Sequence, residues 1–285
     1  MVNALTIDVE DYFQVTAFER YVKRSDWGNY PLRVGNNTRR ILDLLDEYGI
    51  KATFFVLGWI AETLTTLVQE IQRRGHEIAC HGYGHELIFH IGPERFRTDI
   101  RRAKHVLENQ CGQRVCGYRA PSYSITSRSL WGLDILVEEG FSYDSSIFPV
   151  RHDTYGIPGA ERFPHTIQTG SGSLVEFPLT TLPLQVGWKK VQLPIAGGGY
   201  LRLLPVEIIR RGISSINTRE QQPAVIYFHP WEIDPDQPRI KAGMKSRFRH
   251  YLNLQHTEGK LTQLFKTIQF APMKDVLSVQ GYDCG

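Results

Sequence analysis

Residues 51–80, "KATFFVLGWIAETLTTLVQEIQRRGHEIAC", decide the fold class of this chain. The apolar run at 51–57 is typical of a strand that is buried on both faces. Helical spacing follows over 59–75 and ends at Gly75, because glycine favours helix C-termini. Residues 76–80 then form a second short strand. A strand, a helix and a strand in this order predict parallel strands with the helix packed outside the sheet.

The same alternation continues on both sides of this stretch. We expect Asn36 to cap the front of the helix that precedes it and Gly49 to end that helix. We expect Ser127 to cap a later helix. The pattern predicts an α/β fold, either a barrel or a doubly wound sheet. The flanking elements that we expect are a strand at 4–8, a helix at 36–49, a helix at 92–112, a strand at 115–120, a helix at 126–140 and a strand at 141–144.

The composition and the periodicity of the sequence change between about residues 150 and 200. Gly, Pro and Thr become frequent, helical periodicity is lost, and 172–184 suggests short strands. We interpret this region as an irregular insertion within the domain. A helix at 204–220, a strand at 223–231 and a helical end at 244–270 follow, so we expect one domain over 1–285.

Composition limits the classes of function. The chain has 285 residues, of which 41% are apolar and 22% are charged, as in a soluble globular protein. The net charge of +3 is too small to argue for nucleic acid as a partner. No segment approaches the roughly 20 apolar residues that span a bilayer, and the first residues lack the pattern of a signal peptide. We therefore expect a cytoplasmic protein without a membrane span; the oligomeric state stays open.

Polar side chains follow five of the predicted strands. In parallel α/β folds the reacting groups gather at the carboxyl ends of the strands, so these side chains are expected to meet. Their number favours a functional site over isolated surface residues. They are Asp8, Glu10 and Asp11 in "TIDVED", His81 and His85 in "HGYGH", Arg119, Pro121 and Tyr123 in "RAPSY", Asp144 in "DSSIFP", and His229, Trp231 and Glu232 in "FHPWE".

The residue types indicate hydrolysis. Two neutral imidazoles and one carboxylate, with positions left open, are a common set of catalytic zinc ligands, and such a metal activates water and polarises a carbonyl oxygen. A second carboxylate could take a proton from the water, and a separate histidine could protonate the leaving group. An arginine beside the base would hold it ionised and oriented. Together these parts suit an amide or an ester as substrate.

The ordered motifs "TIDVED", "HGYGH", "RAPSY", "DSSIF" and "YFHP" resemble those of the polysaccharide deacetylases, the NodB-homology or family 4-like carbohydrate esterases. The resemblance covers about residues 3–232. It implies a deformed, incomplete (β/α) barrel with a divalent metal, usually zinc, at its mouth. It also implies hydrolysis of an N-acetyl group from an amino sugar. Residues 247–265 resemble the C-terminal extension of a subfamily found with bacterial exopolysaccharide and exosortase gene clusters, which implies a helical extension over about 240–285.

The resemblance also implies a role for each motif residue. The backbone N–H near Tyr123 would help to hold the oxyanion, and Pro121 would shape the groove with Tyr123. Phe148 stands where many members of the family carry tryptophan. The implied roles are base for Asp8, acid for His229, orientation of the base for Arg119, tuning of the acid for Asp144, and metal ligation for His81 and His85.

The first motif departs from the family pattern. The family has two adjacent aspartates, base and then ligand, whereas Val9 separates the acids here. Side chains alternate along a strand, so Asp8 and Glu10 should face one side. We therefore predict Glu10 as the carboxylate ligand, with Asp11 as the alternative if the chain bends after Val9. Gly82 also stands where the family has Ser or Thr.

Three functions compete at this stage. The leading hypothesis is a metal-dependent hydrolase, with Zn²⁺ as the expected cofactor. It would remove N-acetyl groups from an amino sugar or polysaccharide precursor in bacterial exopolysaccharide synthesis. The alternatives are a metal-free hydrolase of cyclic amides or ureides on the same fold, and a catalytically inactive carbohydrate-binding protein. Metal content separates the first two hypotheses, and acetate release separates both from the third.

Overall fold

A nine-stranded, mostly parallel sheet forms the centre of the molecule. The structure, a computed structural model, describes residues 1–186 and 188–284. The strand order is β10-β1-β2-β3-β4-β5-β7-β6, and β11 pairs with β1 off this path. The strands of this sheet are β1 (Asn3–Val9), β2 (Thr53–Val56), β3 (Glu77–Cys80), β4 (Gly117–Tyr118), β5 (Tyr143–Asp144), β6 (His165–Thr169), β7 (Gly172–Glu176), β10 (Val225–Phe228) and β11 (Phe270–Ala271).

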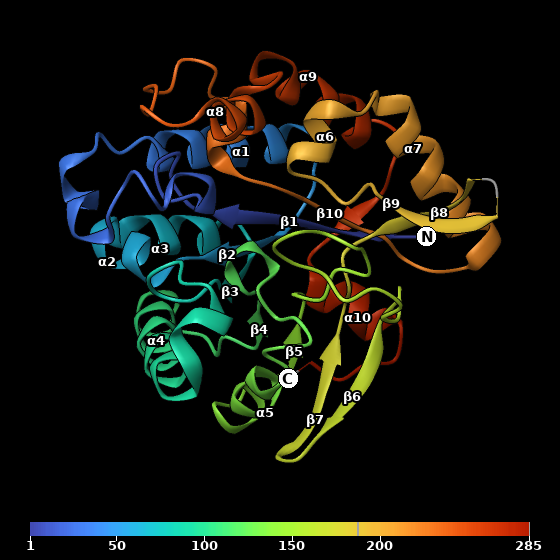
Figure 1. Ribbon diagram of the computed structural model, residues 1–285, viewed down its shortest axis with the longest axis horizontal. Helices are drawn as coiled ribbons and strands as arrows, with labels where there is room; N and C mark the ends of the chain where they lie inside the picture. Colours follow the sequence, from blue (N-terminus) through green and yellow to red (C-terminus); the bar gives the residue numbers. More distant parts are fainter. Residues whose placement is uncertain (187, 285) are drawn as a thin grey trace.

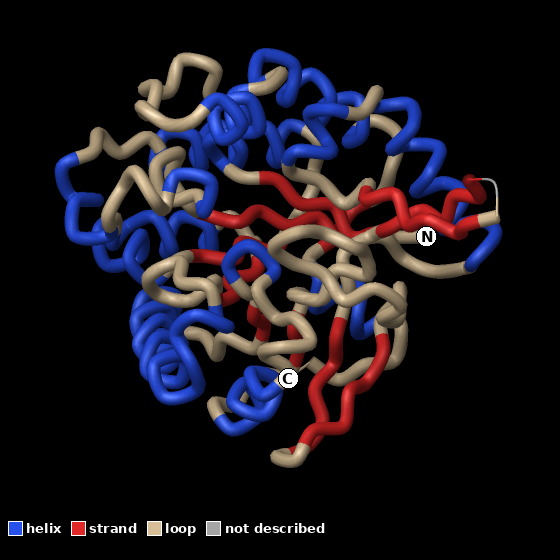
Figure 2. Tube along the Cα trace, in the orientation of Figure 1, coloured by secondary structure: helices blue, strands red, loops and turns tan. Residues whose placement is uncertain are grey.

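Helices lie around the outside of this sheet (Figure 1), and long loops cross the middle of the same view (Figure 2). The α/β class with a parallel sheet is therefore confirmed, and the strand order leaves β10 and β6 at its two ends. The helices are α1 (Val34–Glu47), α2 (Gly58–Thr63), α3 (Thr65–Arg73), α4 (Ile88–Cys111), α5 (Trp131–Glu138), α6 (Gly199–Leu203), α7 (Val206–Ser215), α8 (Met244–Tyr251), α9 (Leu254–Phe265) and α10 (Met273–Val279).

The first strand shows how the sheet separates its apolar side chains from its polar ones. Every residue of β1 is buried. Leu5, Ile7 and Val9 join the main hydrophobic core. Because successive side chains point to opposite faces of a strand, Thr6 and Asp8 face the other side. The strand thus buries its apolar face under the helices and turns a carboxylate inward.

Several helix boundaries differ from the sequence prediction. Helix α1 begins at Val34, before the expected Asn36, and no side chain of its own first turn caps it. The helix expected over 59–75 is two helices, because Leu64 has a non-helical backbone between α2 and α3. Helix α4 begins at Ile88, and Gly92, with φ 76°, interrupts it. Helix α5 begins at Trp131, so Ser127 does not cap it.

The region from 150 to 200 is more regular than predicted. Strand β7 pairs with β5 in parallel and β6 pairs with β7 in an antiparallel manner, so both extend the main sheet. Strands β8 (Thr181–Val186) and β9 (Lys189–Pro194) form a separate hairpin. The C-terminal extension is not only helical, since β11 pairs with Asn3 and Ala4 of β1. These pairings depend on distant partners, which local sequence patterns do not reveal.

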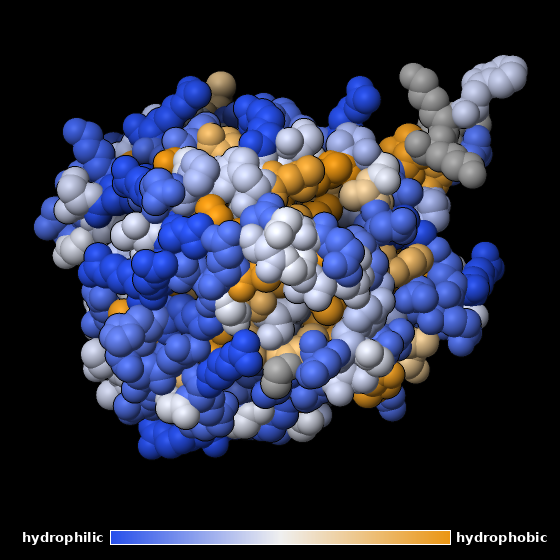
Figure 3. Space-filling view, turned by 90° about the horizontal axis from the view of Figure 1, so that it is seen from below, coloured by the Kyte–Doolittle hydropathy of each residue, from blue (hydrophilic) through white to orange (hydrophobic). Residues whose placement is uncertain are grey.

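In the part of the chain that the structure describes, no helix has both the length and the apolar character needed to cross a membrane. Hydrophilic side chains cover most of the face in Figure 3, and the visible apolar side chains gather towards its middle.

Candidate active site

Glu10, His81 and His85 converge at the carboxyl ends of β1 and β3. Their ligand atoms all lie within 4.8 Å of one another, and all three side chains are buried. Nε2 of His85 is 2.7 Å from Oε2 of Glu10, while Nε1 of Trp231 donates to Oε1 of Glu10 at 3.1 Å. Burial alone would raise the pKa of Glu10, but the neighbouring histidines outweigh it and lower this pKa far below its ordinary value. Glu10 is therefore ionised within a cluster of three side chains that could hold a metal ion.

Hydrogen bonding fixes the ring of His81 in one orientation. Its Nδ1 lies 2.8 Å from the carbonyl oxygen of Arg119, so Nδ1 carries the hydrogen and donates it. The Nε2 lone pair is then free to face Glu10 and His85. Burial lowers the pKa of His81 to about 4, which keeps the ring neutral near pH 7. A histidine fixed through its second nitrogen is the usual arrangement of a metal ligand.

Two charged side chains fix the turn between the histidines. The carboxylate of Asp99 accepts the amides of Tyr83 at 2.7 Å and Gly84 at 3.0 Å. The guanidinium of Arg24 donates to the carbonyls of Gly84 and His85. Neither Asp99 nor Arg24 was identified from the sequence, because each lies far from the motif along the chain. Together they make the glycine-rich turn rigid.

Gly82 is required in this turn by its conformation. Its φ is +75°, which side chains rarely adopt, and a Cβ there would lie 2.9 Å from Oδ2 of Asp99. The departure from the Ser or Thr of the family therefore has a local structural reason. His85 itself has φ 49°, a strained value for a residue with a side chain.

Asp11 lies away from the cluster, at the N-terminus of α1. Its Oδ2 accepts the amides of Arg33 and Val34, and its Oδ1 accepts the amide of Tyr12. A carboxylate in this position satisfies amides that a helix leaves free at its start. Asp11 thus provides the cap that was expected from Asn36. Strand β1 ends at Val9, yet Asp8 and Glu10 both line the same cavity.

Asp8 forms a buried ion pair with Arg119. Nη1 of Arg119 is 2.7 Å from Oδ1 of Asp8 and 2.7 Å from the hydroxyl of Thr6. The other guanidinium nitrogens donate to the carbonyl and the hydroxyl of Ser145. Arg119 has no exposed surface, so it serves within the protein and not as a surface charge. It leaves the second oxygen of Asp8 towards the cavity.

His229 follows β10 and faces both carboxylates of the first motif. Its Nε2 lies 3.5 Å from Oε1 of Glu10 and 4.0 Å from Oδ2 of Asp8. Burial would lower the pKa of His229, but Glu10, Glu232 and Asp8 outweigh it and raise the pKa to about 9. The ring therefore carries a proton at neutral pH, as a general acid requires.

Glu232, and not Asp144, holds the other side of this ring. Oε2 of Glu232 lies 2.9 Å from Nδ1 of His229 and also accepts its backbone amide. The prediction that Asp144 tunes His229 must be corrected, because Ser146 and Glu176 surround the carboxyl group of Asp144. The sequence indicated Glu232 only as a residue at a strand end.

Asp144 and Glu176 form a buried carboxyl pair below the site. Burial raises the pKa of Asp144 to about 6 and raises that of Glu176 well above its ordinary value. The hydroxyl of Ser146 donates to Asp144 at 2.5 Å, and the amide of Ile147 donates to Glu176 at 2.9 Å. Two adjacent carboxyl groups cannot both be ionised easily, so this pair holds a proton. The pair supports the region around β5 and β7.

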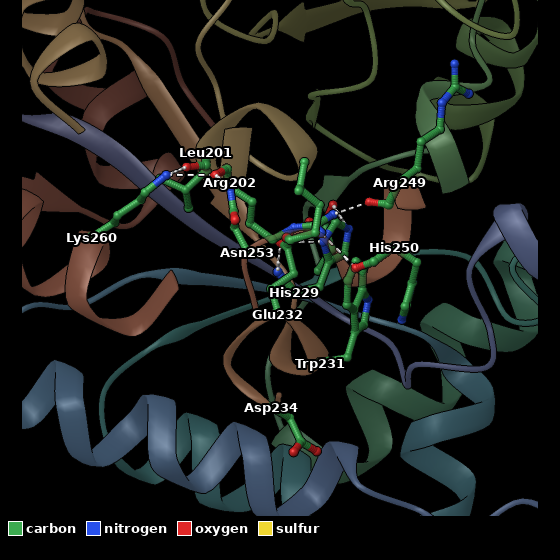
Figure 4. A network of polar contacts seen from close by, with 12 residues as sticks. Leu201, Arg202, His229, Trp231, Glu232, Asp234, Arg249, His250, Asn253 and Lys260 are labelled. Carbon is green, nitrogen blue, oxygen red and sulfur yellow. Dashed lines mark hydrogen bonds and ion pairs between the residues drawn. The ribbon is translucent and has the colours of Figure 1, made fainter. Parts of the chain in front are cut away.

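A buried arginine extends the histidine–glutamate pair into the C-terminal part of the chain (Figure 4). Nε of Arg202, on α6, lies 2.6 Å from Oε1 of Glu232. The remaining guanidinium nitrogens donate to the carbonyls of Arg249, His250 and Leu252. No sequence motif indicated Arg202. Its contacts join α6, the turn after β10 and the end of α8 in one network.

The carbonyl of Arg202 is also fixed. Lys260, on α9, donates to it at 2.8 Å, and Asn253 donates to it at 3.1 Å. The "GGGY" stretch at 197–200 leads into α6, and a Cβ at Gly197 would lie 1.7 Å from the carbonyl oxygen of Tyr227. Glycine therefore permits the close approach to β10 that places Arg202 beside Glu232.

The turn at 121–123 forms another wall of the site. Ser122 and Tyr123 have φ values of 49° and 55°, both in the left-handed region. The amide of Tyr123 donates to the carbonyl of Ala120, so it is engaged within the turn. In the described part of the chain the amide of Ser122 forms no hydrogen bond. Phe148 packs edge-on against Tyr123, below the cavity.

These groups open into one cavity of about 600 Å³. Asp8, Glu10, His81, His85 and His229 all lie on its wall. Tyr123 also lines it, whereas Asp11 and Asp144 do not. The volume is within the roughly 300–1,000 Å³ that is usual for small-molecule sites. A possible metal cluster, a carboxylate–arginine pair and a protonated histidine therefore share one binding space.

The fold and this site define an α/β protein with a cavity of buried ionisable side chains at the carboxyl ends of a parallel sheet. Residues 26–136 match the family model described as polysaccharide deacetylase, and this part of the chain is related to that family. Residues 145–278 match a domain of unknown function, DUF3473. The second segment contains Arg202, His229 and Glu232, while Asp8 and Glu10 precede both segments.

Known proteins support this relationship. The chain is 34% identical over 122 residues to a peptidoglycan deacetylase-like protein of Gibberella zeae, covering 42% of this chain and 35% of that protein. It is 28% identical over 145 residues to a peptidoglycan-N-acetylglucosamine deacetylase of Bacillus cereus, covering 47% and 52%. The chain thus spans about a third to a half of the length of these relatives.

A solved structure shows the same fold over nearly the whole chain. It is a Mycobacterium smegmatis protein with a provisional assignment as a polysaccharide deacetylase. The TM-score is 0.62 at 22% identity, covering 98% of this chain and 91% of that one.

Proposed function

We propose that this protein is a metal-dependent hydrolase that removes the N-acetyl group from an amino sugar. One observation carries the proposal: the cluster of Glu10, His81 and His85 faces the same cavity as the Asp8–Arg119 pair and the protonated His229. A metal-ligand set, a base and an acid are the parts that amide hydrolysis needs. The match of residues 26–136 to the polysaccharide deacetylases supports the same reaction.

Glu10, His81 and His85 fit a divalent cation and would hold it. The donor set is two imidazoles and one carboxylate, which suits zinc, and His81 already presents a free Nε2 towards the other two. A cation bound there would act as a Lewis acid and draw electron density from an oxygen atom of water or substrate. Zinc is our proposal for its identity.

The residues of the chain divide the proton transfers. Asp8, held by Arg119, takes a proton from a water molecule whose oxygen then bonds to the acetyl carbonyl carbon. The free amide of Ser122 offers a donor for the negative oxygen that develops on that carbon. His229 gives its proton to the sugar nitrogen as the carbon–nitrogen bond breaks. Water is consumed, and acetate and a free amine are formed.

Metal analysis of the purified protein, with acetate release from an N-acetylated sugar before and after chelation, tests this function. We expect about one metal ion per chain and activity that a chelator removes and added Zn²⁺ restores. His81→Ala and His85→Ala should lose both metal and turnover, whereas Asp8→Asn and His229→Ala should lose turnover and keep the metal. His105→Ala is the control, because His105 is exposed and its one hydrogen bond within the described residues is to Asn109.

Two other functions remain in competition. A metal-free hydrolase of cyclic amides or ureides would keep its activity after chelation. A carbohydrate-binding protein without catalysis would bind the sugar and release no acetate. The complete set of base, acid and ligands favours the deacetylase over both.

We also propose that the substrate is a precursor of bacterial exopolysaccharide. This part rests on the resemblance of residues 247–265 to a subfamily associated with exopolysaccharide and exosortase gene clusters. Identification of the natural sugar that this protein modifies tests this proposal. The expected cytoplasmic location and the single-domain organisation over 1–285 stay predictions.

A further inference from the structure

The two sides of the active-site cavity carry opposite charges. The inner wall bears the carboxylates of Asp8 and Glu10, where the acetyl group would react. The outer wall is formed partly by α8, which contributes Lys245, Phe248 and Arg249. A substrate that fills the cavity therefore meets exposed cations in addition to the buried carboxylates.

Lys245 and Arg249 belong to a strongly basic stretch, residues 237–257. All five cations of this stretch are exposed in the structure, and residues 237–257 contain no Asp or Glu. The nearest carboxylate to Lys245 is that of Asp153, at 4.0 Å, and its side chain is itself largely exposed. Such charges create a positive potential that attracts anions to the mouth of the cavity. The five are Arg239, Lys241, Lys245, Arg247 and Arg249.

Arg249 is free to meet a ligand. Its carbonyl oxygen accepts a hydrogen bond from Arg202, whereas its guanidinium extends away from that network in Figure 4. In the described part of the chain this guanidinium forms no ion pair. The main chain of Arg249 thus supports the site, and its guanidinium has no hydrogen-bond or ion-pair partner among residues 1–186 and 188–284.

Apolar side chains stand beside these cations. Phe248 is 64% exposed and Leu203 is 56% exposed, and both line the cavity. Tyr155 lines it as well and stacks against Phe148. Aromatic and apolar surfaces next to cations suit a sugar unit that carries a charged group.

We propose that Lys245 and Arg249 form a subsite for an anionic group, phosphate or carboxylate, that is attached to the N-acetylated sugar or to the unit next to it. The inference rests on the proposed deacetylase function and specifies its substrate class. Arginine and lysine side chains recognise both anions through charge-assisted hydrogen bonds. The two sources of the anion are a phosphate ester of the sugar and an acidic neighbouring sugar.

Two pairs of probes of similar size separate these sources. N-acetylglucosamine 1-phosphate is compared with methyl N-acetylglucosaminide, and the disaccharide of glucuronic acid and N-acetylglucosamine is compared with diacetylchitobiose. Acetate release gives kcat/KM, and calorimetry gives Kd independently of turnover. We expect one anionic probe to have a kcat/KM about tenfold higher and a Kd about tenfold lower than its neutral partner, and this preference to shrink as salt rises.

The double variant Lys245→Gln/Arg249→Gln should abolish the preference of the anionic probe over its neutral partner. Lys241→Gln is the matched control, because Lys241 lies in the same stretch but does not line the cavity. Equal Kd values for anionic and neutral probes in the unchanged protein would overturn the subsite. So would a preference that the double variant retains. Acetate release from neutral probes alone would contradict the subsite and leave the proposed deacetylase function intact. Tight anion binding without acetate release from any probe would contradict the deacetylase function and support the subsite.

Discussion

Oε2 of Glu232 lies 2.9 Å from Nδ1 of His229, and this contact sets the direction in which the ring can transfer a proton. Because Nδ1 donates to Glu232, Nε2 faces Glu10 and Asp8. Arg202 holds the opposite oxygen of Glu232 at 2.6 Å. The orientation of the proposed acid therefore depends on Glu232, which the sequence indicated only as a strand-end residue, and on Arg202, which lies outside every motif recognised in the sequence.

Loss of the Glu232 carboxylate should lower kcat without a comparable change in KM. In Glu232→Gln the neutral amide no longer stabilises a protonated His229, so we expect turnover to fall by about 10- to 100-fold. Arg202→Lys should fall less, since lysine keeps the charge but loses the planar set of donors. Steady-state acetate release measures both. Asp236→Asn, an exposed carboxylate of the same loop, is the control, and equal losses in it would refute a specific role for Glu232.

Single substitutions of Glu10 and Asp11, the two acids that follow Val9, should have different effects. One should change metal binding and the other should change stability. Glu10→Gln should weaken metal binding, because it removes the charge that faces His81 and His85. Asp11→Asn should keep the metal and lower the free energy of unfolding by about 1 kcal/mol, since an amide cannot accept all the hydrogen bonds at the start of α1. Metal titration and denaturant unfolding distinguish these effects. Metal loss in Asp11→Asn alone would mean that Asp11 is the ligand.

Two glycines of the histidine turn should respond differently to substitution. Gly82→Ala should lower the free energy of unfolding by about 1–2 kcal/mol, because its φ is +75°. It should also weaken metal binding, since the added Cβ would push on Asp99. Gly84→Ala is the matched control, because the atoms nearest its Cβ would be 3.6 Å away. Similar losses in both variants would show that the turn tolerates no side chain at all.

His76 should make folding sensitive to acid. Its Nδ1 accepts the amide of Ala52 at 3.2 Å, which a protonated ring cannot do. Burial lowers its pKa to about 4, whereas in the unfolded chain it is near 6.5. Between these values the unfolded state binds more protons, so the stability from this residue is present above pH 6.5 and is lost as pH falls towards 4.

Denaturant unfolding at pH 7, 6, 5 and 4 measures this loss. His76→Gln should show a smaller decline between pH 6.5 and 4 than the unchanged protein, because glutamine does not titrate. His105→Gln should decline like the unchanged protein, since His105 is exposed. If His76→Gln keeps the full decline, other groups cause the acid sensitivity.

Much of the fold could be predicted because its signals are local. The apolar runs of β1 and β2 and the alternation at Asp8 and Glu10 need only neighbouring residues to be interpreted. The order of motifs placed His81, His85 and His229 at strand ends, where the structure also has them. The ligand and catalytic roles given to these residues stay predictions that the variants above test.

The missed features depend on contacts between distant segments. Glu232 meets Arg202 across 30 positions of the chain, and Asp99 meets the histidine turn across about 15. No period or turn signal marks such pairs. The same holds for β6 and β7, which join the main sheet only because β5 offers an edge. The prediction that Asp144 tunes His229 was wrong because it rested on the place of Asp144 in a family motif and not on a contact between the two side chains.

The pairing of β1 with both β10 and β11 has a consequence for how the chain is made. Ala4 pairs with Val225 and with Ala271, so the first strand has neighbours that leave the ribosome last. While synthesis proceeds from the N-terminus, one edge of β1 stays without its partner. The histidine pair is complete by residue 85, but His229, and then the carbonyls that hold Arg202, arrive much later. A nascent chain would therefore contain all three proposed metal ligands long before it contained the proposed acid.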